Sequence, residues 1–122
     1  MNVFQRLPRR LLLAAFWLAL VVIAVLALLP ATMPLPSTGW DKANHTLAFA
    51  VLALLGSACW PSMNGRVLVA LAAYGGAIEI AQTFTETRMG EWIDWLADVA
   101  GLAVAAAYLA WKHRRRRRRA AP

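Results

Sequence analysis

The sequence predicts an all-α fold: a small bundle of four transmembrane helices, with both chain ends in the cytoplasm. Three observations support this prediction. The chain has 122 residues and is 61% hydrophobic, more than the roughly one half that is typical of a soluble domain. Its net charge is nevertheless +7, and the basic and acidic residues lie in different segments. The apolar residues form four runs near the length that crosses a hydrocarbon core of about 30 Å.

The first apolar run occupies residues 11–29 and follows a basic leader at residues 1–10. It is long enough to span a membrane at about 1.5 Å per residue. A cleaved signal peptide is the alternative, but its apolar region is normally about 7–15 residues long and ends in a small-x-small cleavage site. Because this run is longer and ends in Leu29-Pro30-Ala31-Thr32-Met33, we expect a retained anchor.

The remaining spans follow in one domain that covers residues 11–111, with a core at 41–105. Residues 30–40 (PATMPLPSTGW) contain three prolines and end at Trp40, which predicts an extended loop at the membrane interface. Spans are expected at 41–60, 66–84 and 93–111, with a tight loop at 61–65. The lone Cys59 excludes an intrachain disulfide.

The distribution of charge predicts the topology. Apart from Lys42 and Arg88, the basic residues lie at the N-terminus, at Arg66 and in the tail at 112–122. The positive-inside rule places these segments in the cytoplasm and the loops at 30–40 and 85–92 outside the cytoplasmic (inner) membrane. The tail should attract anionic membrane lipid. An arginine run without interleaved aromatic residues does not indicate nucleic-acid binding.

Several polar residues lie inside or at the outer ends of the predicted spans. Such residues are costly in hydrocarbon and are candidates for function. Helical rise places His45, Glu79 and Asp98 about 6–8 Å below the outer helix ends, and spacings of three or four residues put their neighbours on the same helix faces. We expect a polar pocket open to the outside. Its candidate residues are Asp41, Lys42, His45, Glu79, Gln82, Arg88, Asp94 and Asp98.

Some of these residues also have a simpler interpretation. Asp41 and Asp94 suit helix N-termini, where an acid caps free N–H groups, and His45 alone could be an interfacial histidine. Lys42 and Arg88 are expected to neutralise the acids. Two further residues, Glu86 and Glu91, are expected to be solvated loop charges, and Trp92 and Trp95 to be interface anchors or an aromatic wall at the pocket mouth.

Glu79 is the residue least compatible with a purely structural role. It lies too deep for a loop charge and towards a helix C-terminus, where the helix dipole disfavours an anion. Small residues then predict which helices touch, because the small-xxx-small pattern lets backbones approach closely. The third and fourth spans should be neighbours, with contact positions at Ala72, Gly76, Ala97, Gly101 and Ala105.

Two of these polar segments are similar to motifs of one known family. Asp41-Lys42-x-x-His45-x-x-x-Phe49 resembles the DKxxHxxxF signature of VanZ-like membrane proteins. The segment that begins Glu79-x-x-Gln82 resembles the E-x-x-Q…R…D…N/D-x-x-G part of the same family, and continues with Arg88, Asp94, Asp98 and Gly101. The resemblance covers about residues 41–105.

The resemblance implies a small multi-pass protein of the bacterial cell envelope. The family is named for a protein that gives low-level resistance to teicoplanin, a lipid-tailed glycopeptide, and no reaction is established for it. By position, the family's motif residues correspond to the eight pocket candidates named above. This chain departs from the pattern at Ala105, where glycine is common, and at Asp98, where asparagine is frequent.

Three functions remain open from the sequence. A non-enzymatic envelope module would bind a lipid head group, a lipid-linked precursor or a lipoglycopeptide. An intramembrane enzyme would use His45 with Glu79 and Asp98 as base and carboxylates, or as ligands of a divalent metal, although the chain lacks HExxH and GxSxG motifs. A purely structural salt-bridge network is the third. We expect no cofactor and a non-enzymatic role, and oligomerisation remains open.

Overall fold

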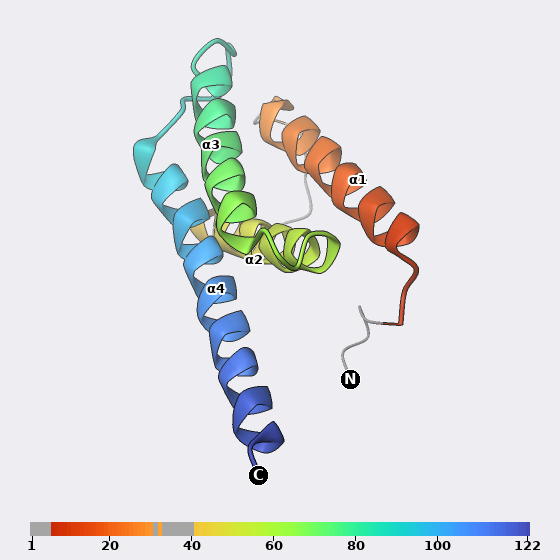
Figure 1. Cartoon of the computed structure of the whole chain (residues 1–122). Helices are drawn as coiled ribbons and strands as arrows, with labels where there is room; N and C mark the ends of the chain where they lie inside the picture. Colours follow the sequence, from red (N-terminus) through yellow and green to blue (C-terminus); the bar gives the residue numbers. More distant parts are fainter. Residues whose placement is uncertain (1–5, 31, 33–40) are drawn as a thin grey trace.

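The computed structural model describes residues 6–30, 32 and 41–122, and it consists of four α-helices. They are α1 (Arg9–Leu28), α2 (Asp41–Cys59), α3 (Asn64–Gln82) and α4 (Trp92–Ala120), as Figure 1 shows. The prediction of an all-helical chain with four helices is confirmed. The expected interfacial loop and Trp40 lie outside the described residues, except for Pro30 and Thr32.

The short connections explain where the helices end. Between α2 and α3 the chain turns within residues 60–63, where the Met63 amide donates to the Trp60 carbonyl at 3.0 Å. At the end of α3, the Thr83 hydroxyl donates to the Ile80 carbonyl at 2.6 Å and the Thr85 hydroxyl to the Gln82 carbonyl at 2.8 Å. These hydroxyls satisfy carbonyls that a helix end leaves without intrahelical donors.

The helix α4 continues well beyond the predicted span end at residue 111. It runs through the arginine tail to Ala120 and is therefore about 43 Å long at 1.5 Å per residue. Arginine is a good helix former, and Arg117, Arg118 and Arg119 lie in the last turn, where positive charge complements the helix dipole. The Arg115 guanidinium also lies over the Trp111 ring, 4.8 Å from its centroid.

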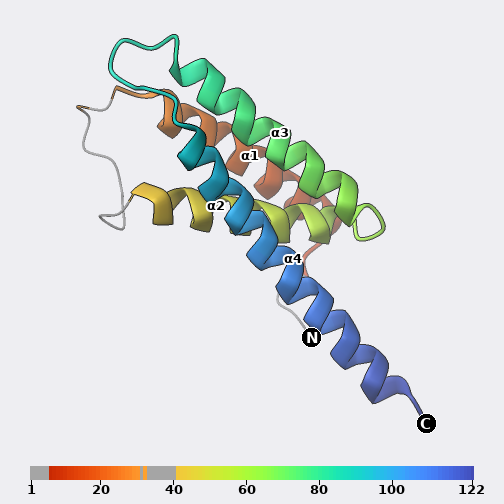
Figure 2. The ribbon, with the colours of Figure 1, turned by 90° about the vertical axis from the view of Figure 1, so that its left-hand side faces the viewer.

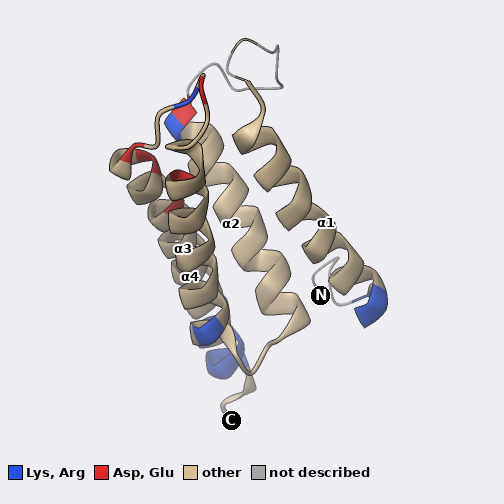
Figure 3. Cartoon of the chain, turned by 90° about the horizontal axis from the view of Figure 1, so that it is seen from above, with Lys and Arg blue, Asp and Glu red and all other residues tan. Residues whose placement is uncertain are grey.

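Contacts between helix ends show that α1 and α2 run in opposite directions and that α2 and α4 begin at the same end of the molecule. Arg9 at the start of α1 donates through Nε to the Cys59 carbonyl at the end of α2, at 3.4 Å. Lys42 at the start of α2 bonds Asp94 at the start of α4. Acidic segments consequently gather at one end of the molecule and most basic segments at the other, as seen in Figure 3.

The most extensive helix contact joins α2 and α4, which cross each other in Figure 2. A side chain at Gly101 would collide with the Thr46 backbone carbonyl, so only glycine permits this approach. The Thr46 hydroxyl donates to the Ala97 carbonyl at 3.0 Å in the same interface. Ala97 and Gly101 are therefore close-packing residues, but their partner is α2 and not only α3.

The predicted contact between α3 and α4 is also present. The Trp95 indole N–H donates to the Ala72 carbonyl at 2.9 Å, and a Cβ at Gly76 would lie 3.5 Å from the same indole nitrogen. Trp95 is therefore part of the helix packing. The apolar core lies along α2, where Phe49, Leu52 and Ala53 are almost completely buried.

Two of the four described helices, α1 and α4, are long and apolar enough to cross a membrane. The helices α2 and α3 do not meet this criterion, and α2 begins with the polar residues Asp41, Lys42 and His45. Large apolar side chains are exposed on every helix, and Phe84 in the loop after α3 is 86% exposed. Apolar exposure on this scale is unusual for a soluble monomer and favours association with a membrane.

A groove of about 330 Å³ lies between α1 and α3, on the side away from α4. We call it the α1–α3 groove. Its walls are apolar except for Arg66 and the Tyr74 hydroxyl, which donates to the Leu20 carbonyl of α1. Its lining includes Phe16, Trp17, Leu20, Trp60, Leu71 and Tyr74.

Candidate functional site

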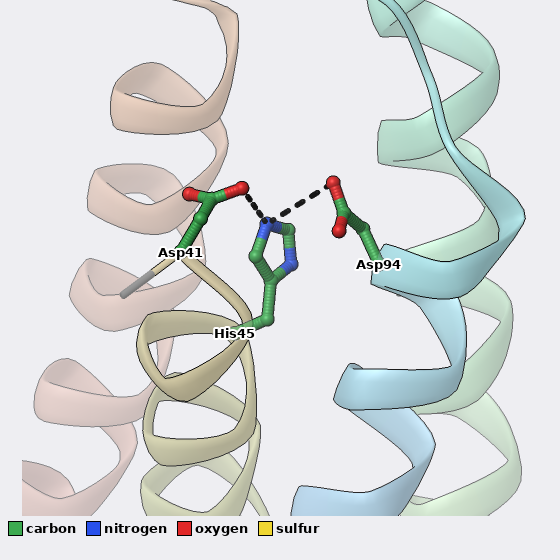
Figure 4. A group of neighbouring side chains, drawn as sticks. All are labelled: Asp41, His45 and Asp94. Atoms are coloured by element: carbon green, nitrogen blue, oxygen red, sulfur yellow. Dashed lines mark ion pairs between the residues drawn. The ribbon is translucent and has the colours of Figure 1, made fainter. Parts of the chain in front are cut away.

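His45 is the centre of a polar cluster at the acidic end of the molecule. Its Nδ1 atom lies 2.8 Å from Oδ1 of Asp98, within hydrogen-bond distance. On the other side of the ring, Nε2 lies 4.0 Å from Asp41 Oδ2 and 3.9 Å from Asp94 Oδ2, an arrangement drawn in Figure 4. The imidazole of α2 thus faces carboxylates from its own helix and from α4.

Lys42 supplies the positive charge of the cluster. Its ammonium group bonds Asp94 Oδ1 and lies 3.4 Å from Oε2 of Glu91. Asp94 therefore presents one oxygen to Lys42 and the other towards His45. Lys42 acts as the counter-ion that the sequence predicted, and the expectation that Glu91 is only a solvated loop charge was wrong.

Glu79 reaches the cluster from α3 and is only 7% exposed. Its Oε2 atom accepts a hydrogen bond from the Glu91 backbone amide at 2.9 Å. The other oxygen, Oε1, is buried and has no hydrogen-bond partner among the described residues. One Glu79 oxygen lies within 4.8 Å of a His45 ring nitrogen and of an Asp98 oxygen, so the three residues predicted at one depth do meet.

Asp98 is the most deeply buried member of the cluster, at 1% exposure. Space for its carboxylate exists because Gly75 on α3 has no side chain: a Cβ there would lie 2.8 Å from Asp98 Oδ2 and 3.1 Å from the Phe49 ring. Gly75 was not among the residues predicted for the site or for helix packing. It lies four residues before Glu79 and hence on the same helix face, which is the signal that could have found it.

Two of the eight predicted pocket residues point elsewhere. Gln82 donates through Nε2 to the Ala27 carbonyl at 2.9 Å, and Arg88 donates through Nε to the Leu29 carbonyl at 2.6 Å. Both acceptors belong to the C-terminal end of α1, where carbonyls lack intrahelical donors. Arg88 forms no ion pair within the described part of the chain, contrary to its expected role as a counter-ion.

The structure therefore gathers a defined set of residues, which we call the polar cluster. It joins α2, α3 and α4 through one imidazole, one ammonium group and five carboxylates. Its members are Asp41, Lys42, His45, Glu79, Glu91, Asp94 and Asp98. The sequence predicted all of them as pocket residues except Glu91.

The polar cluster is rich in possible metal ligands. Two groups of three residues have ligand atoms within 4.8 Å of one another: Asp41, His45 and Asp94, and His45, Glu79 and Asp98. The first group is open, since the Asp41 side chain is 66% exposed, whereas the second is largely enclosed. Imidazole and carboxylate can also hold and move protons, so the geometry permits ligand binding and acid–base chemistry alike.

Comparison of the chain with protein-family models, curated proteins and solved structures finds no match.

Proposed function

We propose that this chain is a VanZ-like integral membrane protein of the bacterial cell envelope whose polar cluster binds a polar head group at the outer face. The observation that carries the proposal is the polar cluster itself. Four charged or titratable side chains, Asp94, Asp98, Glu79 and His45, are buried or half-buried between three helices. Burying such groups costs free energy. Ligand binding is a reason for the chain to retain them.

The proposed topology has four membrane crossings with both termini in the cytoplasm. The alternating helix directions support this topology. The separation of acidic from basic ends in Figure 3 also supports it, since basic segments favour the cytoplasmic side. The contacts of α1 with Gln82 and Arg88 support its retention as part of the bundle. A green fluorescent protein fused after Pro122 should fluoresce, and an alkaline phosphatase fused there should be inactive; the reverse result contradicts this topology.

The charge of the polar cluster limits the classes of ligand that it can bind. Five carboxylates face one lysine and one histidine, so the cluster repels a bare phosphate. It favours a head group that offers ammonium or hydroxyl donors, as a lipid, a lipid-linked precursor or a lipoglycopeptide can. The apolar surface around the bundle would accommodate the lipid tail.

Teicoplanin susceptibility of a sensitive host that expresses the protein tests the proposal. Parallel strains carry Glu79→Gln or His45→Ala, vancomycin serves as the control drug, and the folded membrane protein is quantified in each strain. Wild type should protect against the lipid-tailed drug, and the folded variants should not. Folded wild type that gives no protection would overturn the resistance function.

A structural network is the second candidate, because His45 bonds Asp98 between α2 and α4, and Glu79 of α3 accepts a hydrogen bond from the Glu91 amide just before α4. Buried ion pairs often specify packing more than they stabilise it. This candidate predicts that His45→Ala and Glu79→Gln disappear from the membrane, whereas a binding site predicts folded proteins without function.

A further inference from the structure

We propose that His45, Glu79 and Asp98 form a binding site for a divalent transition-metal cation such as Zn²⁺. The inference goes beyond head-group binding and does not depend on it. The three residues come from α2, α3 and α4, and one ligand atom from each lies within 4.8 Å of the others. Two ligand atoms bonded to one cation at about 2.0–2.2 Å are at most about 4.4 Å apart, so side-chain shifts of about 1 Å or less would bring all three atoms to bonding distance.

The Glu79 carboxylate has an oxygen atom without a bonding partner among the described residues, and this points to a bound ion. It is more than nine-tenths buried, and its Oε2 is held by the Glu91 backbone amide at 2.9 Å. That bond fixes the carboxylate while Oε1 stays buried without a hydrogen-bond partner in the described chain. Unpaired buried carboxylate oxygens are costly, and a metal ion supplies the partner that this oxygen lacks.

The surrounding charges support a cation and not an anion. Lys42 is engaged with Asp94 and Glu91, and Arg88 is directed to the Leu29 carbonyl of α1. Among the described residues, the inner carboxylates Glu79 and Asp98 have no lysine or arginine ion-pair partner. A divalent cation would balance these two negative charges.

The ligand types select the class of metal. Imidazole nitrogen suits Zn²⁺ and its transition-metal neighbours, whereas Mg²⁺ and Ca²⁺ prefer oxygen alone. With the metal on Nδ1, His45 Nε2 faces Asp94 Oδ2 at 3.9 Å and Asp41 Oδ2 at 4.0 Å. Carboxylates beside the second ring nitrogen commonly orient metal-bound histidines. Lys42 holds the other oxygen of Asp94 and so fixes that carboxylate.

The direct test is metal binding by the purified full chain in detergent micelles, prepared with a tag that contains no histidine. After treatment with a chelator, the protein is titrated with Co²⁺, whose visible absorption reports nitrogen and oxygen ligands, and with Zn²⁺ in competition with a colorimetric chelator. We expect about one ion per chain and little competition from Mg²⁺.

Substitutions of the three proposed ligand residues test where the ion binds. Glu79→Gln, Asp98→Asn and His45→Ala should each weaken Zn²⁺ binding more than about tenfold. Two matched controls, Glu86→Gln and His113→Ala, change an exposed carboxylate and an exposed imidazole outside the polar cluster, and they should bind as wild type does. Equal binding by the cluster variants, or loss of binding in His113→Ala, would overturn the proposal.

A measurement on wild type alone covers the case in which a variant fails to fold. A ligand that binds only the folded state raises the unfolding temperature. Zn²⁺ should therefore raise the unfolding midpoint of wild type relative to the chelator-treated protein, and Mg²⁺ at equal concentration should not. Wild type that shows neither this shift nor a Co²⁺ spectrum has no such site, whatever its effect on teicoplanin susceptibility.

Discussion

The polar cluster and the α1–α3 groove differ in how their surroundings constrain them. In the cluster, Asp98 is fixed by the His45 ring and by a gap that only Gly75 leaves. The groove is about 330 Å³ of open space between apolar side chains. The difference indicates that α2, α3 and α4 are packed around a specific polar arrangement, whereas α1 is held by the buried apolar side chains Leu12 and Phe16 and by hydrogen bonds to its backbone carbonyls. Substitutions should therefore have large effects in the cluster and small effects at exposed positions of the groove.

The largest effect is expected for Asp98→Ala. This change removes the buried partner of His45 Nδ1 and leaves a void beside Phe49 and Gly75. Breaking a buried charged pair typically costs about 3–5 kcal/mol, so the free energy of unfolding in detergent should fall by about 3 kcal/mol. The matched change Glu86→Ala, at an exposed loop position, should have little effect. A loss below about 1 kcal/mol for Asp98→Ala would show that the His45–Asp98 contact does not organise the cluster.

Gly101→Ala should come next, because a Cβ at this position meets the Thr46 carbonyl and the Ala50 amide, which are backbone atoms that cannot rotate away. Overpacking of this kind costs about 1–3 kcal/mol, and we expect a lower unfolding temperature with α2 and α4 separated. Gly65→Ala is the control, since nothing lies within 4 Å of a Cβ there. Equal stability of the two variants would contradict the close α2–α4 approach.

Gln82→Leu should have a moderate effect that is concentrated on α1. The change removes the Nε2 donor to the Ala27 carbonyl, and a hydrogen bond of this type contributes about 1 kcal/mol. Hydrogen exchange should become faster in α1 and remain unchanged in the α2–α4 interface. Faster exchange across all four helices would instead place Gln82 within the polar cluster.

The smallest effect is expected for Ala70→Leu, which adds carbon atoms in the α1–α3 groove. The free energy of unfolding should change by less than about 0.5 kcal/mol, as is usual for substitutions outside a packed core. Ala53→Leu is the matched comparison, because Ala53 is fully buried in the core and has no room for a larger side chain. Similar losses in the two variants would mean that the groove is closed in solution.

Part of this arrangement was predictable from the sequence. Helix rise alone put His45, Glu79 and Asp98 at one depth, because residues four or five positions inside a helix end lie at similar distances from it. Their convergence also required that neighbouring helices alternate in direction and turn these faces towards one another. The same reasoning failed for Gln82 and Arg88, since the direction of a side chain depends on the rotation of its helix and on where α1 lies.

Other features of the packing and of the site could not be predicted without the three-dimensional arrangement of the helices. The small-xxx-small pattern indicated that α4 is approached closely, but a small residue does not identify its partner, and Gly101 faces α2. Gly75 makes room for Asp98 although the pattern favoured Gly76 beside it. Glu91 joins the cluster through its ion pair with Lys42 and through its backbone amide, and side-chain patterns carry no information about the amide bond.

The central claim is that Glu79 is kept in the polar cluster for a ligand and not for stability, and Glu79→Gln tests it most directly. The amide oxygen of glutamine can still accept the Glu91 N–H, while the unpaired carboxylate charge at Oε1 is removed. Measured in detergent with a chelator present, the variant should be as stable as wild type or more stable by up to about 1 kcal/mol, because an unpartnered buried charge is costly. A loss of about 2 kcal/mol or more would show that Glu79 is a structural residue and would contradict the claim.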